Sequence, residues 1–288
     1  MPYYEYQCPA CLEMNDISEN VCAHCGHTFS DPINVRRSLI PAEVAALEKR
    51  YQDARAHIKS LSLEAEADLL EAEVLNKGKA VLNLRFDFLW DWLMHAGKSY
   101  QSYRRTVAAD LRKRAKFNND LERSLVESAL FGSNIDIIYA ALTLDEGSVP
   151  SYGPVSIILR TSNIEKRTSA LETNSFFFVR KAIADGWTLS DPLPPGHMAP
   201  WANRQRLALA KLQGILKPAI SVKEIADAVL SSDGDRAKDD FIELYIYGNI
   251  IAAGVEKIKI PVSLTSSFDP KTTAQLDELK SKYVVEEY

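Results

Sequence analysis

The chain has 288 residues, of which 46% are hydrophobic, and a formal net charge of -5 at pH 7. A chain of this length and composition can bury a core, which argues against wholesale disorder, and its acidity argues against binding nucleic acid by overall positive charge. We expect a cytoplasmic protein with no membrane partner, because no apolar run reaches the roughly 20 residues that span a bilayer and the N-terminus lacks the features of a signal peptide.

All the cysteines lie near the N-terminus, in two Cys-x-x-Cys pairs: Cys8 with Cys11, and Cys22 with Cys25. Two such pairs supply the four thiolates of a tetrahedral zinc shell, and no cysteine remains for a disulfide framework. Four thiolates leave no open coordination position, so we expect a structural zinc ion and leave His24 and His27 out of the shell. Residues 1–30 are therefore predicted to form a zinc ribbon, with Gly26 in a tight turn.

The segment 31–133 is predicted to be mainly helical. From Pro41 onward, apolar residues recur at alternating spacings of three and four, which is typical of a coiled-coil seam: Val44, Leu47, Tyr51, Ala54, Ile58 and Leu61. The seam ends near residue 77, before Gly78. Such a helix packs on its own chain or on a second copy, so a homodimer stays open. A second helix is predicted over an apolar stripe: Leu82, Phe86, Leu89, Trp90 and Leu93.

A basic stretch follows between Tyr100 and Lys116. Its cations could contact phosphates or form a solvated helix face: Arg104, Arg105, Arg112, Lys113, Arg114 and Lys116. This Arg104–Lys116 basic face and the ribbon are the candidate contacts for a nucleic-acid or protein target. A further helix is predicted to begin at a cap, Asn119 or Asp120, and to end at Gly132.

After Gly132 the pattern changes, and residues 134–288 are predicted to form an α+β domain. Five short apolar runs are typical of strands: Ile135 to Leu144, Val155 to Leu159, Phe176 to Val179, Ile242 to Tyr247, and Ile258 to Leu264. A helix is expected from about Arg204 to Leu216. The sequence has no Gly-rich phosphate loop and no His-Glu-x-x-His, so the common enzyme signatures are missing.

One carboxylate in the predicted strands lies among aromatic residues. Alternation puts Glu243 on the same face as three aromatic side chains: Phe241, Tyr245 and Tyr247. In a half-buried cleft the pKa of this carboxyl group would rise and make it chemically useful. On a solvated surface the aromatic residues would merely suit a β-strand.

Short motifs follow one another along residues 134–288: Tyr152-Gly153-Pro154-Val155 leading into the strand Ser156 to Arg160, then Arg167-Thr168-Ser169, Asn174-Ser175-Phe176, and the Phe-Ile-Glu-Leu strand that ends at Gly248. In this order they resemble an ADP-ribosyltransferase-type domain of bacterial or phage toxin or defence proteins. The resemblance implies a split, half-open β-sandwich that binds NAD in a cleft. It does not extend to the ribbon or to the helices.

The resemblance also implies roles for individual residues. Glu243 would be the catalytic glutamate, which stabilises the oxocarbenium ion formed when the bond between nicotinamide and ribose breaks. Asn174 and Ser175 would line the nicotinamide pocket, and Tyr152 would close over the cofactor.

Two further features of the motifs concern the pyrophosphate and the acceptor. Arg160 or Arg167 would hold the NAD pyrophosphate through bidentate hydrogen bonds. Phe241 stands two positions before Glu243, where many family members that modify proteins have Glu or Gln, so the acceptor stays open.

Three functions are therefore compatible with the sequence. The first is an NAD-dependent ADP-ribosyltransferase, a toxin or anti-phage effector that acts on nucleic acid or protein and has an antitoxin as a possible partner. The second is a non-enzymatic zinc-ribbon adaptor that binds nucleic acid or a protein. The third, a nuclease or glycosidase, needs a second acid or a histidine near Glu243, for which the candidates are Asp239, Asp240 and His197.

Overall fold

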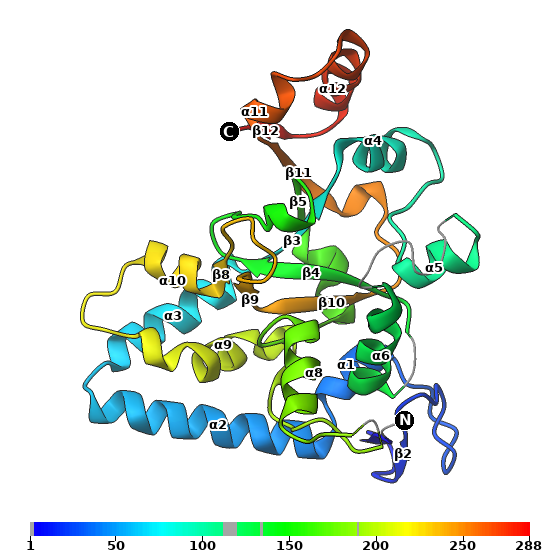
Figure 1. The fold of residues 1–288 in the computed structure, drawn as a ribbon. Helices are drawn as coiled ribbons and strands as arrows, with labels where there is room; N and C mark the ends of the chain where they lie inside the picture. The colour runs from blue at the N-terminus through cyan, green and yellow to red at the C-terminus, as the bar shows by residue number, and fades with distance from the viewer. Residues whose placement is uncertain (1–2, 112–119, 133–134, 189) are drawn as a thin grey trace.

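The structure, a computed structural model, describes residues 3–111, 120–132, 135–188 and 190–288 (Figure 1). Its centre is an eight-stranded sheet with the strand order β12-β11-β5-β3-β4-β10-β6-β7. Neighbouring strands are antiparallel except β11 and β12, which are parallel. The strands, in chain order, are β3 (Lys79–Leu84), β4 (Ile137–Thr143), β5 (Val155–Leu159), β6 (Thr168–Leu171), β7 (Met198–Pro200), β10 (Glu243–Tyr247), β11 (Val255–Ile260) and β12 (Val285–Glu287).

The sheet bends at β3. This strand pairs with β4 only over Lys79–Val81, whereas it pairs with β5 over Ala80–Leu84. In Figure 1, β5 and β11 rise steeply while β4 and β10 run across the view. The predicted sandwich-like arrangement is thus corrected: apart from a separate two-stranded hairpin, the described strands of this region form one bent sheet, and β3 comes from the segment 31–133 that was predicted to be helical.

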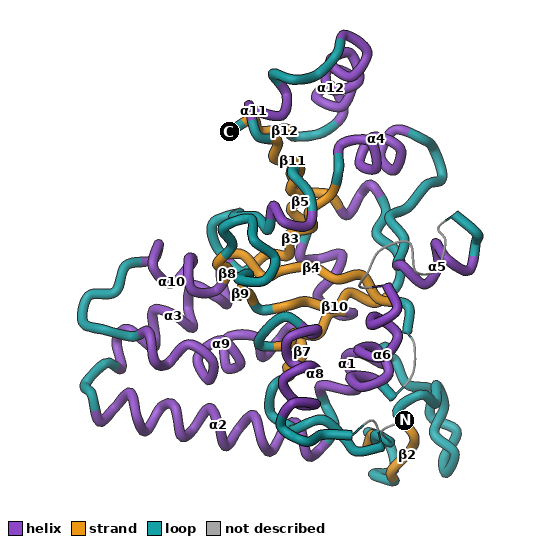
Figure 2. Tube along the Cα trace, viewed as in Figure 1, coloured by secondary structure: helices purple, strands orange, loops and turns teal. Residues whose placement is uncertain are grey.

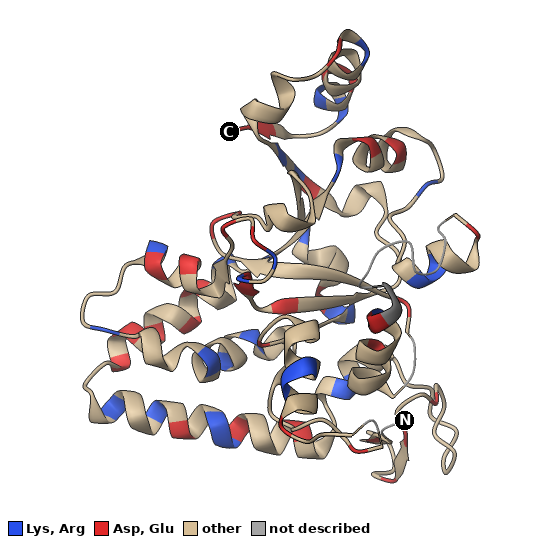
Figure 3. Ribbon diagram, viewed as in Figure 1, with Lys and Arg blue, Asp and Glu red and all other residues tan. Residues whose placement is uncertain are grey.

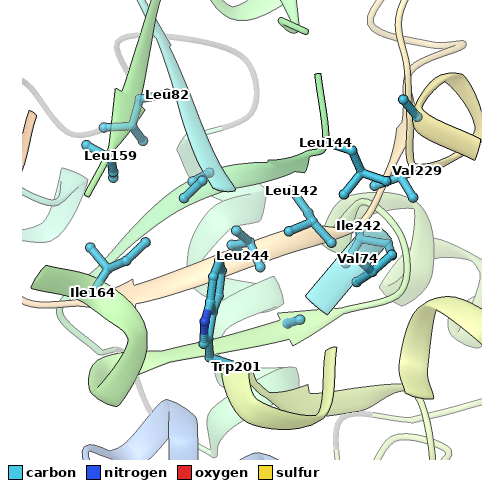
Figure 4. Close-up of a cluster of buried hydrophobic side chains, with 14 of the residues drawn as sticks. Val74, Leu82, Leu142, Leu144, Leu159, Ile164, Trp201, Val229, Ile242 and Leu244 are labelled. Atoms are coloured by element: carbon cyan, nitrogen blue, oxygen red, sulfur yellow. The ribbon is translucent and has the colours of Figure 1, made fainter. Parts of the chain in front are cut away.

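One face of the sheet is covered by α2 (Pro41–Ser60), α3 (Glu64–Lys77), α9 (Arg204–Leu212) and α10 (Val222–Val229). Figure 2 shows these helices stacked beside the orange strands. Their apolar side chains meet those of β4 and β10 in the main core (Figure 4), which includes Val74, Leu142, Trp201, Val229, Ile242 and Leu244. Charges of both signs lie along α2 (Figure 3), as expected for a solvated outer face.

The prediction of one continuous coiled-coil helix up to residue 77 is wrong, because this segment forms two helices. α2 ends at Ser60, Ser62 has a φ of +56°, and α3 begins at Glu64. Leu47, Ala54 and Ile58 of the seam are buried, because α2 packs on α9 and β7 of its own chain. These residues therefore fill the protein's own core.

The opposite face is covered by α1 (Ile33–Ser38), α6 (Asp120–Phe131), α8 (Ser175–Ala184) and the N-terminal ribbon, which contains β1 (Glu5–Gln7) and β2 (Met14–Asp16). These elements share a second core with the sheet, which includes Tyr4, Phe29, Phe131, Ile137, Met198 and Tyr245. A third cluster, with Val81, Ile158 and Phe241, lies under the hairpin of β8 (Leu230–Ser231) and β9 (Asp240–Phe241). The ribbon is thus part of the folded body.

The remaining helices are α4 (Phe86–Met94), α5 (Tyr103–Ala108), α7 (Thr161–Ile164), α11 (Val262–Thr265) and α12 (Pro270–Lys282). Helix α12 packs on α4 and buries Leu276 and Leu279. Among the described residues, no helix combines the length and the apolar character that crossing a membrane requires.

Several predicted elements are confirmed, and two are wrong. Strands β4, β5 and β10 and helix α9 lie where the patterns placed them, and α6 ends before Gly132, whose φ is +70°. The strand predicted over Ile258 to Leu264 is confirmed only as far as Ile260, because β11 covers Val255–Ile260 and α11 begins at Val262. The helix predicted over Leu82 to Leu93 is instead β3 followed by α4. The run Phe176 to Val179, predicted as a strand, lies in α8, because the Asn174 side chain caps that helix by accepting a hydrogen bond from Phe176 N–H. Arg112 to Lys116 and Asn119 lie outside the described residues.

Candidate functional site

The four cysteines of the ribbon form one cluster. Their sulfur atoms all lie within 4.8 Å of one another, with Cys8 Sγ 3.8 Å from Cys25 Sγ and Cys11 Sγ 3.6 Å from Cys22 Sγ. A tetrahedral site with Zn–S bonds of about 2.3 Å places its sulfurs about 3.8 Å apart, whereas a disulfide requires about 2.05 Å. The cluster therefore fits one structural zinc ion.

The two Cys-x-x-Cys pairs have the same backbone turn. Leu12 N–H donates to the Cys8 carbonyl over 2.9 Å, and Gly26 N–H donates to the Cys22 carbonyl over 3.0 Å. Both turn residues have a positive φ, +66° for Leu12 and +73° for Gly26. The tight turn predicted at Gly26 is thus confirmed, and each turn aims two sulfurs at one point.

The ribbon is anchored to the body through Tyr4, which is 3% exposed. Its hydroxyl donates to the Ala129 carbonyl over 2.6 Å and accepts from Leu193 N–H over 3.2 Å. The Arg37 guanidinium lies 4.2 Å from the centre of the Tyr4 ring. A zinc ion that orders the ribbon therefore also orders its contacts with α6 and with the loop before β7.

The second candidate site surrounds Glu243 in β10. One carboxylate oxygen, Oε2, accepts hydrogen bonds from Ser175 N–H and from the Tyr245 hydroxyl, each over 2.9 Å. Ser175 is the first residue of α8, so the carboxylate lies at the positive end of a helix dipole. Glu243 is 4% exposed, and strand β10 runs between β4 and β6. The carboxylate is therefore held in one orientation.

Tyr152 and Asn174 complete this cluster. Asn174 Nδ2 donates to the Tyr152 hydroxyl over 2.9 Å, and the Arg236 guanidinium lies 4.3 Å from the centre of the Tyr152 ring. Tyr152 ends the short 3₁₀ helix η1 (Pro150–Tyr152), and the next residue, Gly153, lies against β3. Tyr152 is 41% exposed whereas Asn174 is 2% exposed. Tyr152 is thus the outer member of the cluster.

Burial shifts the acidities in the cluster. Desolvation raises the pKa of Glu243 to about 7, although the hydrogen bonds from Ser175 and Tyr245 favour the charged form. Burial, together with the negative field of Glu243, raises the pKa of Tyr152 to about 12. The carboxyl group is therefore poised between its charged and neutral forms near neutral pH, while the phenol keeps its proton.

A second buried carboxylate, Glu127 of α6, was missed from the sequence. The Tyr139 hydroxyl donates to Glu127 Oε1 over 3.3 Å, and burial raises the pKa of Glu127 to about 7. Tyr139 and Tyr245 lie edge to face with ring centroids 5.5 Å apart, so the two tyrosines that donate to the two glutamates pack on each other. The available signal was a glutamate beside the apolar residues Val126 and Leu130 of one helix.

The two arginines predicted to hold the pyrophosphate stay apart from the Glu243 cluster. Arg160 is exposed at the end of β5, three strand positions from β10, which is about 14 Å along the sheet. Arg167 donates to the Asn163 and Tyr247 carbonyls, at the far end of β10 from Glu243. The structure thus brings together four of the six predicted residues, Tyr152, Asn174, Ser175 and Glu243.

The candidates for a second acid have other partners. Asp239 accepts hydrogen bonds from Ser151 and Ser232, and Asp240 pairs with Lys211 over 2.6 Å. His197 Nδ1 lies 2.7 Å from Glu172 Oε1. None of the three makes a hydrogen bond or ion pair with Glu243 in the described part of the chain.

Comparison of the sequence with models of protein families found no match, and a search of the curated proteins also found none. The candidate sites are therefore defined by their own geometry: a four-cysteine cluster in the ribbon that fits a zinc ion, and a buried glutamate held by groups from β10 and α8.

Proposed function

We propose that this chain is an NAD-dependent ADP-ribosyltransferase, with NAD bound at Tyr152, Asn174, Ser175 and Glu243. The observation that carries the proposal is the cluster that these residues form from three separate segments. Ser175 N–H donates to the Glu243 carboxylate, and the preceding residue, Asn174, donates to the Tyr152 hydroxyl. By analogy with the toxin and defence proteins that the motifs resemble, the proposal includes a role as such an effector, with nucleic acid or protein as the acceptor.

The buried carboxylate suits the chemistry of the proposed reaction. When the bond between the ribose carbon and the nicotinamide nitrogen breaks, nicotinamide leaves with the bonding electrons and the ribose becomes an oxocarbenium ion. A fixed negative group beside that ion stabilises it more than it stabilises NAD itself. The acceptor then bonds to the ribose carbon and loses a proton.

The pKa of about 7 for Glu243 is consistent with a site that binds a cation. Positive charge placed near a buried carboxylate lowers its pKa, so the nicotinamide ring of NAD favours the ionised form that the reaction uses. Tyr152, the exposed member of the cluster, would move to admit the ring and then cover it. Asn174 and the α8 N-terminus would supply hydrogen bonds to the nicotinamide amide.

The test is nicotinamide release from NAD by the wild type and by Glu243→Gln, with cell lysate as a source of acceptors. Glu256→Gln is a matched control, because Glu256 is also a strand glutamate of the same sheet and pairs with Lys79 at the surface. We expect release by the wild type and the control and a loss of at least about a hundredfold in Glu243→Gln. Absence of release by the wild type, or equal release by Glu243→Gln, would overturn the proposal.

A further inference from the structure

A cavity of about 680 Å³ lies where the ribbon meets the sheet, at the end of β10 opposite to Glu243. The ribbon contributes Phe29, α5 contributes Arg104, and β10 contributes Tyr247. Arg36 of α1 and the adjacent pair Lys166 and Arg167 complete its basic wall. The volume lies within the range of small-molecule sites, which is about 300–1,000 Å³.

The four cations of this cavity are Arg36, Arg104, Lys166 and Arg167. Within the described residues, none of them makes an ion pair with a carboxylate. Asp31 and Asp136 also line the cavity, but Asp136 is already paired with Arg105. The cavity therefore has an excess of positive charge, although the chain as a whole is acidic.

Arg36 is the most unusual of the four, because it is 2% exposed. Its guanidinium donates only to backbone carbonyls among the described residues, those of Ile17 and Asp31. Burial lowers the pKa of Arg36 and also that of Arg167, which likewise donates to carbonyls. Buried charges are normally neutralised, so an anion in this cavity would remove a cost that the free protein bears.

Two aromatic side chains in the cavity indicate that the ligand also contains a flat ring. Phe29 and Tyr247 line the same cavity as the cations. Phe29 is 8% exposed and its ring centre lies 5.4 Å from the Arg36 guanidinium, so Tyr247, which is 39% exposed, presents the accessible ring. Guanidinium and ammonium groups bind phosphate oxygens, and aromatic rings stack on nucleobases. Ser18 and Asn20 of the ribbon add polar groups at the rim. Together these groups match a nucleotide unit, with its charged phosphate and its flat base.

We propose that this cavity binds a nucleotide unit through its phosphate, either within a single-stranded nucleic acid or as a free nucleotide. Glu243 and Tyr247 are four residues apart on one face of β10, so the cavity lies about 13 Å from the Glu243 cluster. It is a separate site, and binding there does not require NAD. The predicted basic face contributes Arg104, and Arg167 was predicted to hold the NAD pyrophosphate, whereas Arg36 and Lys166 were not singled out from the sequence.

The experiment measures binding of a fluorescein-labelled single strand of about ten nucleotides by anisotropy at several salt concentrations. The variant is the double charge reversal Arg104→Glu and Lys166→Glu, because both side chains are exposed. We expect a loss of affinity of at least about tenfold and a salt slope that falls by about 1.4, since each phosphate contact on a single strand contributes about 0.7. Competition with AMP distinguishes a free nucleotide from a strand.

The matched control is Lys49→Glu with Lys223→Glu, which makes the same change in net charge at exposed positions of α2 and α10. Binding that is retained by this control and lost by the cavity variant supports the inference. Equal loss in both variants, or no binding of strand and AMP by the wild type at low salt, overturns it. Nicotinamide release measured without an added acceptor separates this outcome from the fate of the transferase proposal.

Discussion

Replacement of Glu43 by Gln should destabilise the whole protein, because Glu43 joins three parts of the fold. Its Oε1 accepts hydrogen bonds from the backbone N–H groups of Gly196, His197 and Met198, each over 2.7 Å. Its Oε2 accepts from Arg37 Nη1 over 2.7 Å. Both side chains of this ion pair are at most 2% exposed, so solvent cannot replace a lost contact.

The size of the expected loss of stability follows from the hydrogen bonds that glutamine can still make. Its carbonyl oxygen can accept the three backbone hydrogen bonds, but its NH₂ group then faces the Arg37 guanidinium, and two donors oppose each other. Breaking one partner of a buried ion pair leaves an unpaired buried charge, which costs about 3–5 kcal/mol. That is a large share of the total stability of a typical protein, about 5–15 kcal/mol.

Urea unfolding at neutral pH measures the difference, with Glu48→Gln as the control. Glu48 lies in the same helix and pairs with Arg206 at the surface, with both side chains more than 40% exposed. We expect a loss below about 1 kcal/mol for Glu48→Gln. A loss for Glu43→Gln that is no larger than for this control would refute the reasoning about the buried pair.

Three further predictions concern the ribbon, the turn before β5 and the buried glutamate. The purified protein should contain about one zinc ion per chain by elemental analysis, and Cys11→Ser should lower both the zinc content and the melting temperature; unchanged zinc would contradict the four-thiolate site. Gly153→Ala should lower the free energy of unfolding by about 2 kcal/mol or more, because a Cβ there would lie 2.5 Å from the Leu84 backbone. In the control Gly214→Ala the new Cβ meets nothing within 4 Å, so this variant should not be destabilised. Similar melting temperatures of the two variants would refute the predicted clash. Glu243 has a pKa of about 7 when folded and about 4.3 when unfolded, so its contribution is present below pH ~4.3 and is lost as pH rises to 7. In urea unfolding, the free energy of unfolding of Glu243→Gln should therefore increase by about 3 kcal/mol relative to that of the wild type between pH 4 and pH 8. Parallel pH profiles of the two proteins would contradict a buried carboxyl group at this position.

The features that could be predicted from the sequence are those that depend on residues close together in the chain. The cysteine spacing predicted the four-cysteine cluster because each pair lies in one turn. The alternation in β10 places Glu243 and Tyr245 on one face, and both contribute to the second core or its polar cluster. Short-range pattern was sufficient in both cases.

The features that the sequence did not predict depend on contacts between distant segments. β3 lies in a helical region, and its apolar run has the length of either a strand or a helix turn, so only pairing with β4 and β5 decides its state. The run after Asn174 is a helix because its cap and its packing on α6 outweigh β-branched and aromatic residues. Glu127 and Arg36 are buried polar residues whose partners lie outside their own helices, Tyr139 for Glu127 and Ile17 for Arg36.

Hydrogen exchange with and without NAD tests whether NAD binds around Glu243. We expect NAD to slow exchange of the amides in residues 150–153 and 174–178, which include Tyr152 and the Ser175 N–H that holds the carboxylate. Exchange in α12, which packs on α4, should stay the same. Unchanged exchange in both segments at saturating NAD, or protection confined to other parts of the chain, would contradict NAD binding around Glu243.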